Sequence, residues 1–293
     1  MPKWLSPLAL LFASLVAVQL CAAQDDSAPA AAFDPASEST SAEPAPDPVQ
    51  PSAFARNTSE WQILGSQWRR SVPDILHDQK QIWLFPLSMA RGHHLKPALA
   101  LLGATVLLAT TDPHNAAYIR NTPALSGFNN AFSGFNTATA TEAFASAFYI
   151  AAIARRNAYD QKTFLLAGEA VIDSEILTTV MKDIDRREAP VSYLPNGNFR
   201  DSWFKVPTNQ GGYLGGLGSM PSGHEIAVMA VATVFAERYP HPAWHRWLAY
   251  GLAAAVGVSR VTLQSHFTSD TFAGGVLGFA IARYVVLARQ PAN

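Results

Sequence analysis

A series of uncharged apolar runs constrains the fold of this chain more than any other feature. The runs cover residues 97–111, 143–154, 226–236, 248–259 and 271–282. Each is shorter than the roughly 18–20 residues that cross a membrane as a helix. None shows the alternation of apolar and polar residues that a half-buried strand requires. The sequence therefore predicts an all-α fold, a helical bundle of about six core helices.

Prolines and turn-forming residues set the expected limits of the helices. Pro73 and Pro86 are expected to break the helical pattern near the start of the domain, and Asp112-Pro113 to end a helix. The expected helices cover residues 97–111, 141–156, 162–183, 223–238, 243–260 and 266–288. Stretches rich in Gly, Asn, Ser, Thr or Pro predict loops over residues 114–140 and 190–221.

The first 23 residues have the organisation of an export signal. Lys3 precedes an apolar stretch, Leu8–Leu20, and Cys21-Ala22-Ala23 offers small residues for cleavage. Cleavage there would leave a mature protein without cysteine, which suits an oxidising compartment. We therefore expect a signal peptide over residues 1–23 and an exported protein of the periplasm or cell envelope. Acylation of Cys21 and an uncleaved anchor are the alternatives.

Composition divides the remaining chain into a spacer and a folded domain. Residues 24–60 are rich in Ala, Pro, Ser and acidic groups and contain few large apolar side chains, so we expect a disordered spacer. Residues 61–293 should form the helical domain, with a catalytic core at about 97–290. The whole chain is 49% hydrophobic and 15% charged, which allows a sizeable core.

Charge and metal-ligating residues limit the partners to be expected. No basic patch of the kind that binds nucleic acid is present. The single cysteine and the scattered histidines form no metal-ligand pattern, so neither a metal nor another cofactor is expected. The short apolar runs favour a soluble or peripheral protein over an integral membrane protein, and membrane association stays an alternative. No feature of the sequence indicates an oligomeric state.

Two short segments carry the residue types of metal-free phosphoryl transfer. They are Pro221-Ser222-Gly223-His224 and Ser259-Arg260, the latter followed by His266 and Asp270. One histidine can attack phosphorus while the other protonates the leaving oxygen. The arginine and the Ser-Gly turn can hold phosphate oxygens. Asp270 lies four residues after His266, so a helix would bring the two side chains to one face.

These segments resemble the second and third signature motifs of the type 2 phosphatidic acid phosphatase superfamily. That superfamily includes bacterial non-specific acid phosphatases and vanadium-dependent haloperoxidases. The resemblance implies that His266 is the nucleophile, that His224 is the general acid and that Asp270 orients His266. It also implies that Arg260, Ser222 and Gly223 bind the phosphate, with the backbone of an α-helix N-terminus assisting.

The first motif of that superfamily is incomplete in this chain. The pattern is a lysine, six free positions and Arg-Pro, and here Lys182 and Pro190 match whereas Ala189 occupies the arginine position. By the resemblance, Lys182 binds phosphate. Arg187 is the candidate to replace the missing guanidinium, with Arg186 and Arg200 as further candidates.

The resemblance implies a metal-independent phosphatase that cleaves phosphate monoesters of a small molecule or a lipid through a phosphohistidine. Vanadate would then act as an inhibitor. One alternative is a vanadium-dependent haloperoxidase, in which the same pocket holds vanadate as a prosthetic group. The other is a non-catalytic envelope protein that binds a phosphorylated ligand, which the alanine at position 189 would suit.

Overall fold

The structure is a computed structural model that describes residues 54–120, 123–192, 199–206 and 215–290. Within these ranges the chain forms helices and no strand, which confirms the all-α prediction. The α-helices are α2 (Phe54–Ala90), α3 (Leu95–Arg120), α4 (Ser126–Ala131), α5 (Gly134–Ala154), α6 (Ala158–Asp185), α7 (Gly223–Arg238), α8 (Trp244–Thr262) and α9 (Thr268–Ile281). Single 3-10 turns lie at Pro123–Leu125 and Pro190–Ser192, and a π-helical turn, Ala282–Val286, continues α9. The long helices from Leu95 onward, α3 and α5 to α9, correspond to the six predicted.

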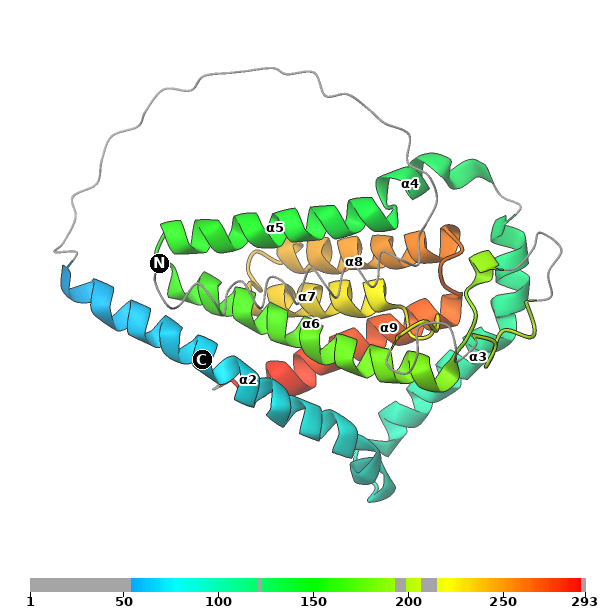
Figure 1. Cartoon of the computed structure of the whole chain (residues 1–293), viewed down its shortest axis with the longest axis horizontal. Coiled ribbons are helices and arrows are strands. Elements are labelled where there is room, and N and C mark those ends of the chain that lie inside the picture. The colour runs from blue at the N-terminus through cyan, green and yellow to red at the C-terminus, as the bar shows by residue number, and fades with distance from the viewer. Residues whose placement is uncertain (1–53, 121–122, 193–198, 207–214, 291–293) are drawn as a thin grey trace, which may run out of the picture.

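The bundle is arranged around α7. Figure 1 shows α5, α6, α7 and α8 running roughly along the long axis of the molecule, with α3 lying across one end. Helix α7 packs against α6, α8 and α9, and α2 runs along the outside of the bundle against α6. One end of α7 therefore meets the ends of several other helices, which is where the site described below is assembled.

The main core joins α6, α7 and the end of the chain. It consists of small and branched apolar side chains from these three elements: Leu166, Ala167, Ala170, Ile226, Ala230, Val234, Ile281, Ala282 and Val286. Two of the uncharged runs, 226–236 and 271–282, supply most of them. Burial of these runs explains why both segments lack charge, because an unpaired charge in such a core would be strongly destabilising.

Helices α7 and α9 lie unusually close together because glycines of α9 face α7. A Cβ atom on Gly278 would lie 2.2 Å from the backbone oxygen of Ile226, and one on Gly274 would lie 2.8 Å from the backbone oxygen of Ser222. Both distances are shorter than any real Cβ contact, so only glycine allows this approach. The second of these contacts brings the start of α7 next to the start of α9.

The C-terminal segment holds α2 against α6. The guanidinium of Arg289 lies 3.0 Å from Asp74, 3.3 Å from Asp78 and 2.8 Å from Glu169. Gln79 of α2 also donates to the side chain of Asp173 at 2.9 Å. These polar contacts join three segments that are far apart in the sequence.

The predicted breaks at proline are wrong. Helix α2 runs through Pro73 and Pro86, and α3 continues through Pro113 to Arg120. An interior proline removes one backbone hydrogen bond and bends a helix, but it need not end the helix where neighbouring residues are held by tertiary contacts. Asp112 supplies such contacts in α3, because its carboxylate is buried and bonded to α9.

The predicted loop over residues 114–140 is also wrong. This segment contains the end of α3, the short helix α4 and the first residues of α5. Ser133 caps α5 by accepting a hydrogen bond from the backbone N–H of Asn136 at 3.2 Å, so a residue that indicated a loop is a helix N-cap. The predicted loop over residues 190–221 has only a 3-10 turn in its described parts.

The beginning of the domain also differs from the prediction. Helix α2 begins at Phe54, within the segment 24–60 that we expected to be a spacer. The rest of that segment and the expected signal peptide over residues 1–23 lie outside the described residues.

Helix α3 leaves most of its apolar surface uncovered by protein. Among the described residues, Leu95–Ile119 is the one segment long and apolar enough to cross a membrane, and only 6% of its most apolar window is buried. Leu99, Leu102, Val106 and Leu107 are each more than half exposed. A core helix of a soluble bundle would bury such residues.

We predict that Gly278→Ala lowers the free energy of unfolding by about 1–3 kcal/mol, since the added methyl group forces α7 and α9 apart. Gly251→Ala in α8 is the matched control, because a Cβ atom there has no neighbour within 4 Å. Denaturant unfolding of both variants measures the difference. Equal stability of the two variants would contradict the close packing of α7 and α9.

Candidate active site

Residues of both predicted motifs meet at one end of α7. Ser222 is the N-cap of α7, where its hydroxyl accepts a hydrogen bond from the Glu225 N–H at 3.4 Å. Its own N–H donates to the backbone carbonyl of Asp270 in the first turn of α9 at 3.0 Å. Because Gly274 allows this approach, the Ser-Gly-His turn lies directly beside the segment that carries His266.

His266 is almost completely buried and its orientation is fixed by the backbone. Its side chain is 2% exposed, and Nδ1 lies 2.7 Å from the carbonyl oxygen of Ser219. A carbonyl oxygen only accepts, so Nδ1 carries the proton of the neutral ring and Nε2 keeps the lone pair. This is the tautomer that a nucleophilic imidazole needs.

Burial and neighbouring positive charges keep His266 neutral. Desolvation is the largest effect that lowers its pKa well below 6.5, and the charges of Lys182, His224 and Arg260 lower the pKa further. The hydrogen bond to Ser219 opposes this shift. The same effects show that three of the predicted site residues lie close enough to His266 to act on its charge.

The predicted orienting role of Asp270 needs correction. Its Oδ2 atom lies 4.0 Å from Nδ1 of His266, too far for a hydrogen bond, and Ser219 occupies that position on the ring. Oδ2 instead accepts from the N–H of Phe267 at 2.9 Å. Asp270 can therefore stabilise a positive charge on His266 through space, while the carbonyl of Ser219 orients the ring.

Lys182 lies beside the start of α7. It is buried in the last turn of α6, and its Nζ lies 3.9 Å from the position that a Cβ atom on Gly223 would take. The carboxyl oxygens of Glu175 lie 3.8 Å from the same position. Burial raises the pKa of Glu175 to about 7, and Lys182 opposes this rise.

Arg260 approaches the same site from the end of α8. It is fully buried, its Nε donates to the hydroxyl of Ser259 at 3.2 Å, and Nη2 donates to the carbonyl of Phe132. His224, the second residue of α7, is half-buried. A neutral imidazole, two buried cations and a second histidine next to a helix N-terminus can together bind a phosphate and transfer it.

The structure gives no support to the predicted phosphate-binding role of Arg187. The Arg187 side chain is 1% exposed, and its guanidinium lies 2.8 Å from Asp112 and 2.5 Å from Asp270. It also donates to Ser202 and Ser269, at 3.2 Å and 2.7 Å. Arg187 therefore lies behind Asp270, on the Nδ1 side of the His266 ring, and its nitrogens are occupied by protein partners.

The other two arginines considered as replacements for the motif arginine are Arg186 and Arg200. Arg186 ends α6 in the left-handed conformation (φ 42°), and it donates to the Val206 carbonyl at 3.4 Å. Arg200 is exposed. The backbone on either side of Ala189 is nevertheless held near the site, since Glu188 N–H bonds to Ser202 and Val191 N–H to Gln264.

Sequence reasoning did not find Ser219, Glu175 or Asp112. Ser219 acts through its backbone, which no residue type reveals. Glu175 lies seven residues before Lys182 and so shares a face of α6 with it, which is a signal that could have been used. Asp112 reaches the site from α3, and no local pattern indicates such a long-range contact.

Among the described residues, no three His, Cys, Asp or Glu side chains are grouped so that they could hold a metal ion. The fold and the site thus define a helical protein with a histidine-centred, cation-lined anion site. Residues 163–293, which carry the site residues from Lys182 to Asp270, match the family model of the PAP2 superfamily. No curated protein and no solved structure matched the chain.

We predict that Ala189→Arg strengthens the binding of inorganic phosphate by about tenfold, the effect of one added charge-assisted contact. Because Arg187 is held by Asp112 and Asp270, it does not compete for the new side chain's position. Calorimetry with phosphate measures the change, and Ala154→Arg at the distant end of α5 is the control for added charge. Unchanged or weaker binding in Ala189→Arg would place residue 189 outside the anion site.

Proposed function

We propose that the protein is a metal-independent phosphatase that hydrolyses phosphate monoesters through a phosphohistidine at His266. The match of residues 163–293 to the PAP2 superfamily model supports phosphatase-type activity. The observation that carries the finer proposal is the bond from Nδ1 of His266 to the Ser219 carbonyl, because it leaves Nε2 free to attack. No cofactor is required by this chemistry, since cationic side chains supply the charge that a metal would supply elsewhere.

In the first step, the lone pair of Nε2 attacks phosphorus and the bond to the ester oxygen breaks. Protonated His224 gives its proton to the leaving oxygen, which departs as an alcohol. The phosphorylated ring of His266 is cationic because Nδ1 keeps its proton. The carboxylate of Asp270, 4.0 Å from Nδ1, stabilises this charge.

In the second step, a water molecule attacks the phosphorus and the phosphorus–nitrogen bond breaks. His224, now neutral, takes the proton of the attacking water and regains its starting charge. Lys182 and Arg260 stabilise the negative oxygens in both transition states. The products are an alcohol and inorganic phosphate, and both histidines return to their starting forms.

The exposed surface of α3 supports placement at a membrane of the cell envelope. Leu95–Ile119 is long and apolar enough to cross a membrane, and only 6% of its most apolar window is buried. Asp112 of this same helix bonds to Ser269 at the start of α9, so α3 is anchored directly behind the site. This proximity favours a lipid phosphate, although the same chemistry serves a soluble monoester.

A second candidate is a protein that binds phosphorylated ligands without turning them over. It is favoured by Ala189, because the guanidinium of the first motif is missing and Arg187 does not replace it. Removing a positioned donor from a transition-state site can cost about 10²–10³ in rate. Turnover and binding must therefore be measured separately.

We predict that the purified protein releases phosphate from p-nitrophenyl phosphate or from vesicles containing phosphatidic acid, with activity unaffected by EDTA. His266→Ala should reduce the release by about a thousandfold or more, since no phosphoenzyme can form. The exposed His93 provides the control variant, His93→Ala, which should keep wild-type activity. Phosphate binding without release by the wild type would support the non-catalytic candidate instead.

A further inference from the structure

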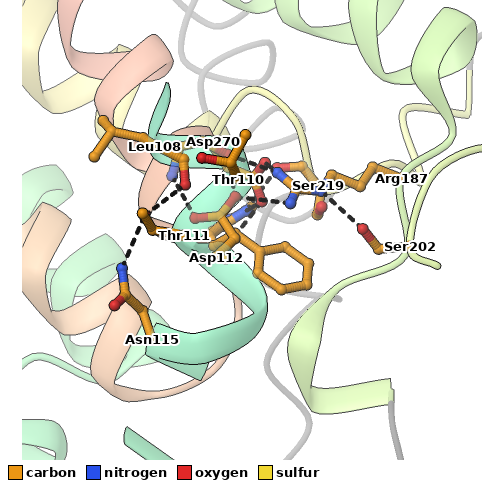
Figure 2. Close-up of polar contacts among 12 residues, drawn as sticks. Leu108, Thr110, Thr111, Asp112, Asn115, Arg187, Ser202, Ser219 and Asp270 are labelled. Atoms are coloured by element: carbon orange, nitrogen blue, oxygen red, sulfur yellow. Dashed lines mark hydrogen bonds and ion pairs between the residues drawn. The ribbon is translucent and has the colours of Figure 1, made fainter. Parts of the chain in front are cut away.

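A buried network of charged side chains lies behind the site (Figure 2). Asp112 of α3, Arg187 after α6 and Asp270 of α9 form two ion pairs, with N–O distances of 2.8 Å and 2.5 Å. Asp112 also accepts a hydrogen bond from the N–H of Ser269 at 3.1 Å, and its second oxygen contacts the Ser269 hydroxyl. All three charged side chains are at most 1% exposed.

Every nitrogen of the Arg187 guanidinium has a protein partner. Besides the two carboxylates, it donates to the hydroxyls of Ser202 and Ser269. Its guanidinium lies 3.9 Å from the ring centre of Phe267 and 4.4 Å from that of Trp203, so it is packed against two aromatic side chains. This environment holds the guanidinium in one orientation.

The network controls both groups that face Nδ1 of His266. The side chain of Arg187 holds Asp270, whose Oδ2 is 4.0 Å from Nδ1. The backbone carbonyl of Arg187 accepts from the N–H of Ser219 at 2.8 Å, and the carbonyl of Ser219 in turn accepts from Nδ1 at 2.7 Å. A displacement of Arg187 would thus move both Asp270 and the Ser219 carbonyl relative to Nδ1 of His266.

The charges of the network complement those of the site. Lys182, His224 and Arg260 place positive charge around His266. Two carboxylates and one guanidinium place a net negative charge on its Nδ1 side. Asp185 also belongs to this side, since it accepts the backbone N–H of Arg187 at 2.9 Å.

Arg187 also favours the ionised form of Asp270. Burial raises the pKa of Asp270, and the guanidinium of Arg187 and the N–H of Phe267 counter this rise. Both oxygens of Asp270 accept hydrogen bonds from N–H groups, which is the arrangement of a carboxylate.

We propose that Asp112 and Arg187 are positioning residues for the phosphoryl transfer: Asp112 holds Arg187, which keeps Asp270 and the Ser219 carbonyl directed at Nδ1 of His266. This inference rests on the proposed function for its kinetic consequences. A buried ion-pair network of this kind adds little to stability compared with apolar side chains of similar size, because its charges are desolvated. A role in the chemistry accounts for its placement against the one ring nitrogen that must stay protonated.

The kinetic test is whether Asp112 acts through Asp270. Asp112→Asn keeps the shape of the side chain, and it should lower kcat by about tenfold or more with KM changed less than about twofold, the scale for partners that orient a reacting group. In an Asp270→Asn background, the same substitution should have an effect of less than about twofold. Asp201→Asn, at an exposed carboxylate, is the control. An equal loss of kcat from Asp112→Asn in both backgrounds would overturn the proposal.

A second variant tests the network in a protein that is expected to stay folded. Arg187→Lys keeps a positive charge beside Asp112 and Asp270, so neither buried carboxylate loses its counter-ion, but an ammonium group cannot reproduce the contacts of the planar guanidinium. This folded variant should fall to the kcat of Asp270→Asn. Wild-type kcat in it would show that the network has no part in the reaction.

A third measurement needs no turnover. The 15N NMR signals of His266, assigned by their loss in His266→Gln, report the tautomer and the pKa of the ring. Asp112→Asn should lower this pKa relative to the wild type, because one negative charge is removed from the Nδ1 side. An unchanged pKa and tautomer would overturn the proposal. If the proposed function itself is wrong, the wild type releases no phosphate while the NMR response to Asp112→Asn is still seen.

Discussion

The close approach of α7 and α9 is the constraint on which the site depends. Gly274 lets the backbone of Ser222 come next to α9. One turn further along, Gly278 lets the backbone of Ile226 come next to the same helix. The N–H of Ser222 then bonds to the Asp270 carbonyl, which places the start of α7 beside His266. Side chains larger than hydrogen at these glycines would separate the two motifs that carry the chemistry.

Within this frame, charge is separated across the His266 ring. Cationic side chains lie around the ring, and their repulsion, added to burial, favours the neutral imidazole in the free protein. A bound phosphate dianion would offset those positive charges. The negative network of Asp112, Arg187 and Asp270 lies on the opposite ring nitrogen, where the phosphorylated intermediate would be positive. The cationic side chains thus suit the bound phosphate dianion, and the negative network suits the positive ring of the phosphorylated intermediate.

The sequence predicted the parts of the structure that depend on local pattern. The uncharged runs 226–236 and 271–282 form core parts of α7 and α9, and the two motif segments meet through the bond from Ser222 N–H to the Asp270 carbonyl. The continuation of α3 through Pro113 was missed, because it depends on tertiary contacts of its neighbour. The contacts of Arg187 and Asp270 were not predicted for a similar reason: their partners come from segments distant in sequence, and a motif names residues without naming what they bind.

The most direct measurement of the central claim is the chemical identity of the phosphorylated residue during turnover. The protein would be mixed with substrate, quenched in alkali to preserve phosphohistidine, digested and analysed by mass spectrometry. The account predicts phosphate on the imidazole of His266. Phosphate on another residue, or steady turnover with no phosphorylated residue at the earliest times, would contradict it.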